Sequence, residues 1–97
     1  MRLRWSRRAL ADMRRLAERI AADKPLAATR FVNSIVAKAA QLKAQPLLGR
    51  SGSQDDTREL VVHANYLLTY RLRGDEVQIL QLWHVARDRP AATVLKT

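Results

Sequence analysis

Apolar residues recur along the N-terminal third of the chain first with a strand period and then with a helix period. Residues 1–5 (MRLRW) alternate apolar and basic side chains, which predicts a short strand with one buried face. Ser6 is a favourable N-cap, so a helix is predicted over residues 7–24. One apolar stripe runs along this helix, made of Leu10, Met13, Leu16, Ala17 and Ile20.

A second helix is predicted from Pro25 to about Gln45. Proline in the first helical turn loses no needed hydrogen bond, so Pro25 indicates a helix start rather than a break. The link between the two helices is so short that they must form an antiparallel hairpin. Pro46 ends the second helix, and residues 47–56 (LLGRSGSQDD) predict an irregular, mobile loop. The stripe of the second helix consists of Ala28, Phe31, Val32, Ile35, Ala39 and Leu42.

Three strands are predicted to follow, over residues 57–63, 66–73 and 76–84. Gly74-Asp75 is a strong hairpin signal between the last two, and Ala64-Asn65 is a weaker one. We therefore expect an α+β fold of order β-α-α-β-β-β, with the helical hairpin packed on one face of a small antiparallel sheet. The core face of the middle strand would carry Tyr66, Leu68, Tyr70 and Leu72, and the other, relatively free face Arg71 and Arg73.

Length and composition bound what such a chain can do. Its 97 residues predict a single domain, and no apolar run approaches the roughly 18 residues of a membrane span. There is no cysteine and no apolar signal segment at the N-terminus, which favours the cytoplasm. Without cysteine, and with only His63 and His84, a metal site is not expected, and no cofactor-binding motif is present.

The positive charge is concentrated in one half of the chain. The net charge is +9, with twelve Lys/Arg against three Asp/Glu in residues 1–50 and six of each in residues 51–97. Such a chain should attract polyanions, either nucleic acid or a strongly acidic protein. A basic surface that only keeps the protein soluble is the alternative.

The polar residues that are candidates for chemistry lie mostly in the C-terminal half. They suit RNA cleavage without a metal, in which one group takes the 2′-OH proton, arginines stabilise the phosphate charge and an acid protonates the leaving oxygen. His84 ends a strand in WHVAR and is the natural proton carrier. The set consists of Arg50, Arg58, Glu59, Tyr66, Tyr70, Arg71, His84 and Arg87.

Five of these residues also have a structural interpretation. Tyr66 and Tyr70 fall on the predicted core face, where packing is their commoner role. Arg58 and Glu59 are adjacent, and a surface ion pair is commoner than an acid/base pair. A single histidine at a strand end is more often structural than catalytic, and His63 at a turn is expected to be solvated.

Five segments occur in an order that resembles a known family: SRRALADMRRLAERIAADKPLAATRFV, PLLGR, TRELVV, YLLTYRL and WHVARDRP. Together they are similar to the RelE/ParE superfamily of bacterial type II toxin–antitoxin toxins, from Trp5 to Pro90. The resemblance implies an antiparallel sheet with a helical hairpin. It also implies a small, often acidic antitoxin partner, whose contacts we assign to Leu16, Ile20, Arg30 and Phe31.

The two branches of this superfamily differ in target: RelE-like members cleave messenger RNA on the ribosome, and ParE-like members poison DNA gyrase. RelE-like sequences commonly carry arginine where this chain has Leu67, and they often end in a tyrosine- or histidine-bearing tail rather than PAATVLKT. The ParE-like function is therefore favoured, with gyrase contacts at Arg50, Arg58, Tyr66, Arg71, His84 and Arg87. The alternative is a ribonuclease using Arg58, Glu59, Arg71, His84 and Arg87.

Overall fold

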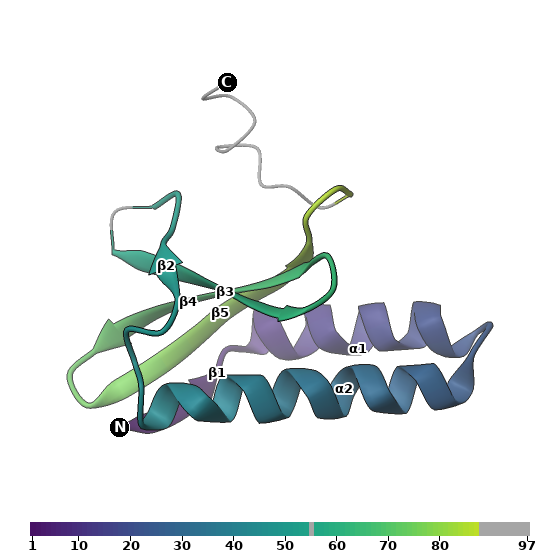
Figure 1. The fold of residues 1–97 in the computed structure, drawn as a ribbon, viewed down its shortest axis with the longest axis horizontal. Helices are drawn as coiled ribbons and strands as arrows, with labels where there is room; N and C mark the ends of the chain where they lie inside the picture. Colours follow the sequence, from purple (N-terminus) through teal and green to yellow (C-terminus); the bar gives the residue numbers. More distant parts are fainter. Residues whose placement is uncertain (55, 88–97) are drawn as a thin grey trace.

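Two helices lie against one face of a five-stranded sheet in the computed structural model, which describes residues 1–54 and 56–87 (Figure 1). The α+β class and the helical hairpin are therefore confirmed. No helix in these two ranges is both long and apolar enough to cross a membrane. The elements are, in order, β1 (Arg2–Trp5), α1 (Arg7–Ala21), α2 (Pro25–Ala40), the 3-10 helix η1 (Gln41–Lys43), β2 (Arg50–Ser51), β3 (Thr57–His63), β4 (Tyr66–Arg73) and β5 (Glu76–His84).

The sheet has the strand order β1-β5-β4-β3-β2 and is mixed. The pairs β2–β3, β3–β4 and β4–β5 are antiparallel, as the hairpin turns require. The first strand instead runs parallel to the last, from Arg2 opposite Glu76 to Trp5 opposite Ile79. The added strand β2 lies within residues 47–56, where an irregular loop was expected.

Local signals placed the helix starts correctly. The Ser6 hydroxyl accepts a hydrogen bond from the Ala9 backbone N–H at 3.0 Å and so caps α1, and Pro25 is the first residue of α2. The first helix ends three residues before the predicted position. The backbone N–H of Lys24 donates to the Ile20 carbonyl at 2.7 Å and so closes the turn that leads into α2.

A β-bulge in β5 changes which of its residues face the helices. Thr69 pairs with Gln81 and Tyr70 pairs with Ile79, so Leu80 is an extra residue on β5. Because of this insertion, Ile79 and Leu82 both lie in the core beneath the helices although they are three residues apart.

The main core lies between the helical hairpin and the sheet. Its largest fully buried side chains are Leu16, Phe31, Ile35, Leu42, Leu68, Tyr70, Val77, Ile79 and Leu82. The predicted stripe of the second helix is confirmed, since its residues are buried or half-buried, although Leu42 lies in η1 beyond the end of α2. On α1 the prediction is wrong for Leu10, which is 49% exposed, whereas Ala9 and Asp12 are buried. The sheet-facing side of α1 therefore starts at Ala9 rather than Leu10.

Candidate functional site

An aromatic and basic cluster forms where β3 ends, β4 begins and β5 ends. Tyr66 and His84 are directly paired across the strands, and their rings meet edge to face at 5.0 Å between centroids. An Nη atom of Arg87 donates to the Tyr66 hydroxyl at 3.4 Å, a long contact. Below them the Phe31 ring of α2 packs against Tyr66 at 4.8 Å. The structure therefore brings together Tyr66, His84 and Arg87, three of the residues predicted from the sequence.

The imidazole of His84 is bonded to the backbone of the turn that follows it. Its Nδ1 atom accepts hydrogen bonds from the backbone N–H groups of Ala86 and Arg87, both at 3.2 Å. This arrangement requires a lone pair on Nδ1, so the proton of the neutral ring belongs on Nε2. His84 therefore holds the backbone of the turn from which the Arg87 guanidinium projects.

His63 stands at the edge of this cluster. Its ring lies 5.5 Å from that of Phe31 in an edge-to-face arrangement, and the residue is exposed. The expectation of a solvated histidine agrees with this exposure, although the ring also packs on an aromatic neighbour.

Arg58 and Glu59 do not form the ion pair that their adjacency suggested. Neighbouring residues of a strand project to opposite faces, and the two side chains have separate partners. Arg58 donates to the Gly49 carbonyl at 2.8 Å. Glu59 lies 3.7 Å from an Nη atom of Arg50 on the neighbouring strand β2. The predicted Arg58–Glu59 pair is therefore replaced by an Arg50–Glu59 pair.

Arg71 lies far along the sheet from His84. On β4 it is five positions beyond Tyr66, the partner of His84, which corresponds to roughly 17 Å of strand. Its Nε donates to the Gln78 side-chain oxygen at 2.9 Å. Arg73 pairs instead with Asp56, and its guanidinium lowers the pKa of that carboxyl. The five residues of the nuclease hypothesis are thus not gathered in one place.

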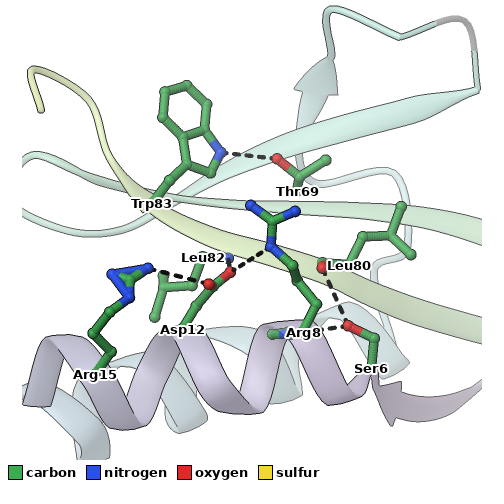
Figure 2. A network of polar contacts seen from close by, with 9 residues as sticks. Ser6, Arg8, Asp12, Arg15, Thr69, Leu80, Leu82 and Trp83 are labelled. Atoms are coloured by element: carbon green, nitrogen blue, oxygen red, sulfur yellow. Dashed lines mark hydrogen bonds and ion pairs between the residues drawn. The ribbon is translucent and has the colours of Figure 1, made fainter. Parts of the chain in front are cut away.

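A hollow of about 430 Å³ opens on the sheet face opposite the helices. Its floor includes Leu67 and Trp83, which are only 4% and 3% exposed. The indole N–H of Trp83 donates to the Thr69 hydroxyl at 2.9 Å on this face, away from α1 (Figure 2). The rim comes from Arg50, Ser51, Gly52, Ser53, Glu59 and Val85. The face is therefore partly covered by β2 and the residues after it.

A buried tyrosine holds the segment before β2 in place. The Tyr70 hydroxyl donates to the Pro46 carbonyl and accepts from the Gly49 N–H, both at 2.8 Å. Burial raises the pKa of Tyr70, and the Gly49 bond and the Arg58 charge offset part of this effect. A Cβ atom at Gly49 would lie 2.8 Å from the Tyr70 ring, so only glycine fits there. Sequence reasoning placed Tyr70 in the core, which is confirmed, but did not assign this contact.

Asp12 is a buried carboxylate that sequence reasoning missed. One of its oxygens accepts the Leu82 backbone N–H at 3.1 Å, on the edge of β5 beyond the end of β1 (Figure 2). The guanidinium groups of Arg15 and Arg8 lie 3.2 Å and 3.6 Å from the carboxylate. An acidic residue four positions from one arginine and three from another was the available signal, but its partner on β5 is 70 residues away.

The outer side of the helical hairpin carries an apolar groove of about 500 Å³ between α1 and α2. Leu10 lines it and is half exposed, and Arg14 and Glu18 lie at its border. Among the residues predicted to contact an antitoxin, Arg30 is exposed and Ile20 is half-buried. Leu16 and Phe31 are each 1% exposed in the core, so the prediction that they contact a partner does not agree with their burial. The groove is lined by Leu10, Met13, Arg14, Ala17, Glu18, Ala21, Ala28, Thr29, Val32 and Asn33.

Comparison with known proteins identifies the family. The profile described as "ParE toxin of type II toxin-antitoxin system, parDE" matches residues 3–89. The chain belongs to the ParE toxin family. The resemblance to the RelE/ParE superfamily is therefore confirmed, and this ParE-family chain is the toxin of a type II, ParDE-like system.

Two curated relatives agree with the assignment to the RelE/ParE superfamily, and a solved ParDE structure shares the fold. The chain is 37% identical over 90 residues to Y4kP of Sinorhizobium fredii, a protein named as a candidate toxin, which covers 92% of this chain and 93% of the relative. It is 35% identical over 83 residues to "Toxin RelE2" of Caulobacter vibrioides, covering 86% and 93%. A chain of the chromosomal ParDE system from P. aeruginosa has the same fold, with a TM-score of 0.80, 28% identity and coverage of 88% and 96%.

Proposed function

We propose that this ParE-family toxin acts in the cytoplasm by binding and poisoning DNA gyrase without cleaving RNA, and that a cognate acidic antitoxin neutralises it. The placement of the candidate catalytic groups is the main support for gyrase binding over RNA cleavage. Arg58 and Glu59 project to opposite faces of β3, and Arg71 lies roughly 17 Å along β4 from the His84 row. General acid–base catalysis needs its groups within hydrogen-bond reach of one substrate, and these are dispersed.

Leu67 supports the same choice. RelE-like sequences commonly place an arginine at this position, whereas here an apolar side chain is 4% exposed in the floor of the hollow beside Trp83. A leucine offers no hydrogen-bond donor to a phosphate. Contact with gyrase would then use residues of the predicted set that are exposed or half-buried, namely Arg50, Arg58, Tyr66, Arg71, His84 and Arg87.

The groove of the helical hairpin is the proposed antitoxin site. Leu10 on α1 lines this groove and is half exposed, and Val36, which is 46% exposed, lies one helical turn beyond the groove residue Val32 on α2. An amphipathic helix could place its apolar side there, in the common helix-in-groove mode of recognition. Arg14 at the border of the groove and exposed Arg30 outnumber Glu18 at that border, which favours a partner with acidic residues beside its apolar stripe.

RNA cleavage is the second candidate, because Tyr66, His84 and Arg87 do lie together at one end of the sheet. This cluster holds a histidine, a phenol and a guanidinium, which are groups that metal-free cleavage could use. RNA cleavage ranks second because the Nδ1 atom of His84 already accepts hydrogen bonds from two backbone N–H groups and is therefore engaged.

Induced expression in a bacterial host, with gyrase supercoiling and messenger cleavage followed side by side, tests the choice. We expect loss of supercoiling and intact messenger in the parent strain. His84→Gln should leave growth inhibition largely intact, whereas Arg87→Gln should weaken it because it removes a charged contact. A parent toxin that cuts messenger, and whose cleavage falls about 10²–10⁴-fold in His84→Gln, would instead establish the ribonuclease.

The antitoxin site has its own test, which is co-purification of the toxin with its cognate antitoxin, which we expect to be a small acidic protein encoded by the adjacent gene. Leu10→Asp places a charge in the groove on an already exposed position, so the toxin should fold and lose affinity for that protein. Val61→Asp, at another exposed apolar position on β3, is the matched control and should bind normally. Equal binding by both variants would place the antitoxin elsewhere.

A further inference from the structure

A row of polar side chains crosses three strands on the sheet face opposite the helices. Arg4 of β1 is paired with Gln78 of β5, and Gln78 is paired with Arg71 of β4. Paired residues project to the same side, and two strand spacings separate the two arginine Cα atoms by roughly 10 Å. The three residues line a hollow of about 200 Å³ together with Ser6 and Leu80. Two guanidinium groups therefore border one small cavity.

A hydrogen bond to Gln78 fixes the orientation of the Arg71 guanidinium. Its Nε donates to the Gln78 side-chain oxygen at 2.9 Å, and the amide nitrogen of Gln78 donates to a Glu76 oxygen at 3.0 Å. Arg71 is half-buried, which restricts its aliphatic stem. It therefore loses less rotamer entropy on binding an anion than a fully exposed arginine would. The bond through Nε leaves the two Nη groups for a further acceptor.

Arg4 is the more exposed arginine of the two. Its nearest carboxylate oxygen, on Glu76, is 3.8 Å away, beyond hydrogen-bond length, and the Arg4 side chain is 68% exposed. An exposed ion pair of this kind contributes little stability and is easily exchanged for a better acceptor. Glu76 also lies 3.7 Å from Arg2, so its negative charge is shared among several donors. The row keeps a net positive charge.

We propose that the hollow between Arg4, Gln78 and Arg71 binds a phosphate group. Guanidinium groups present planar forks of N–H donors that match phosphate oxygens, and two of them on opposite sides suit a tetrahedral anion better than a planar carboxylate. The first turn of α1, which starts beside Ser6, carries no acidic residue to oppose an anion. This site goes beyond the proposed function and does not depend on the identity of the target.

The phosphate has two chemical sources, a nucleic-acid backbone or a free phosphate or nucleotide, and one experiment separates them. The purified protein is titrated with inorganic phosphate, with acetate at equal ionic strength, and with a single-stranded oligonucleotide without terminal phosphates. NMR follows the backbone and arginine Nε–H signals of the protein. Phosphate should shift the signals of Arg4, Arg71 and Gln78, and acetate should not. If the oligonucleotide displaces inorganic phosphate, the site binds backbone phosphate. If it does not, the site binds a free phosphate or a nucleotide.

Variants locate the binding. Arg4→Gln and Arg71→Gln should each weaken phosphate binding about tenfold, which is typical of losing one charge-assisted contact. The matched control is Arg73→Gln, which removes the same charge from the same face of β4, where Arg73 pairs with Asp56 outside the hollow. Gln78→Glu, which places a carboxylate in the row, should abolish binding even if Arg71→Gln proves poorly folded.

Three results would overturn the site: no shift of the Arg4, Arg71 and Gln78 signals on adding phosphate, equal binding of acetate, or equal weakening by Arg73→Gln, which indicates a diffuse basic surface. Failure here is distinguishable from failure of the gyrase proposal, because phosphate binding is measured on the toxin alone and supercoiling is measured with gyrase. A toxin that inhibits gyrase but shows no phosphate shifts would lose only this site.

Discussion

The two faces of the sheet are covered to very different extents. The face beneath α1 and α2 carries Leu68, Tyr70, Val77 and Ile79, all fully buried. The opposite face has Leu67 and Trp83 packed beside β2 at one end and the polar row of Arg4, Gln78 and Arg71 at the other. Burial of apolar area is the main source of folding free energy, so stability should depend chiefly on the first face. The second face has room for recognition because it contributes less to the core.

The largest expected effect comes from the helix-covered face. Ile35→Ala should reduce the free energy of unfolding by about 2–5 kcal/mol, because it removes fully buried apolar atoms and leaves a cavity. Urea denaturation followed by circular dichroism measures it. The adjacent Val36→Ala, on the exposed side of the same helix, is the control and should cost well under 1 kcal/mol. Equal losses would mean that the two sides of α2 are reversed.

Asp12→Ala tests how α1 is fastened to the edge of β5. It should reduce the free energy of unfolding by about 1–3 kcal/mol, because the Leu82 N–H loses its acceptor in a buried position. Asp12→Asn keeps an oxygen acceptor and should lose less. Glu18→Ala, an acidic residue on the exposed part of the same helix, is the matched control. Denaturant curves in which Asp12→Ala and Glu18→Ala coincide would show that this contact contributes nothing.

Tyr70→Phe probes the contact through which the helix-covered face positions the segment before β2. Removing the hydroxyl leaves the Gly49 N–H and Pro46 carbonyl without a partner, at a cost of about 1–2 kcal/mol. Because burial raises the pKa of Tyr70, the unfolded chain ionises at lower pH than the folded chain. The parent should therefore lose stability as the pH rises above about 10, the ordinary tyrosine value.

That part of the pH dependence should be missing in Tyr70→Phe, which has no ionisable hydroxyl at this position. Thermal unfolding of both proteins between pH 8 and 11 compares the slopes. Identical slopes would show that the Tyr70 hydroxyl ionises equally easily in the folded and unfolded chains.

The smallest effect is expected on the opposite face. Thr69→Val keeps the shape of the side chain but removes the acceptor of the Trp83 indole N–H, and should cost about 0.5–1 kcal/mol. The change in the denaturant midpoint is the measurement, and Thr29→Val on exposed α2 surface controls for the substitution itself. A loss as large as that of Ile35→Ala would contradict the contrast between the two faces.

Prediction of the candidate site was less complete than prediction of the fold. The approach of Tyr66, His84 and Arg87 follows from hairpin register, which turn positions determine and which can be reasoned from sequence. The opposite projection of Arg58 and Glu59 was also available from strand alternation. The partners of the two residues were not, because Gly49 and Arg50 reach them only through a loop whose path has no periodic signal.

The sequence by itself determined the local elements. The bounds of residues 57–63, 66–73 and 76–84, the cap at Ser6 and the start at Pro25 all agree with the structure. These features depend on residues within a few positions of one another, where backbone preference and periodicity act directly.

Only the tertiary structure decided which elements and side chains meet. The parallel pairing of β1 with β5, the burial of Asp12 in place of Leu10, and the Tyr70 contact with Gly49 join residues that lie 21 to 74 positions apart. An apolar period shows that a helix has a buried side, but α1 has neighbours on two sides, the sheet and α2. The buried carboxylate is stable on the sheet-facing side because the β5 edge beyond β1 offers it an unpaired N–H, which exists only once the sheet has formed.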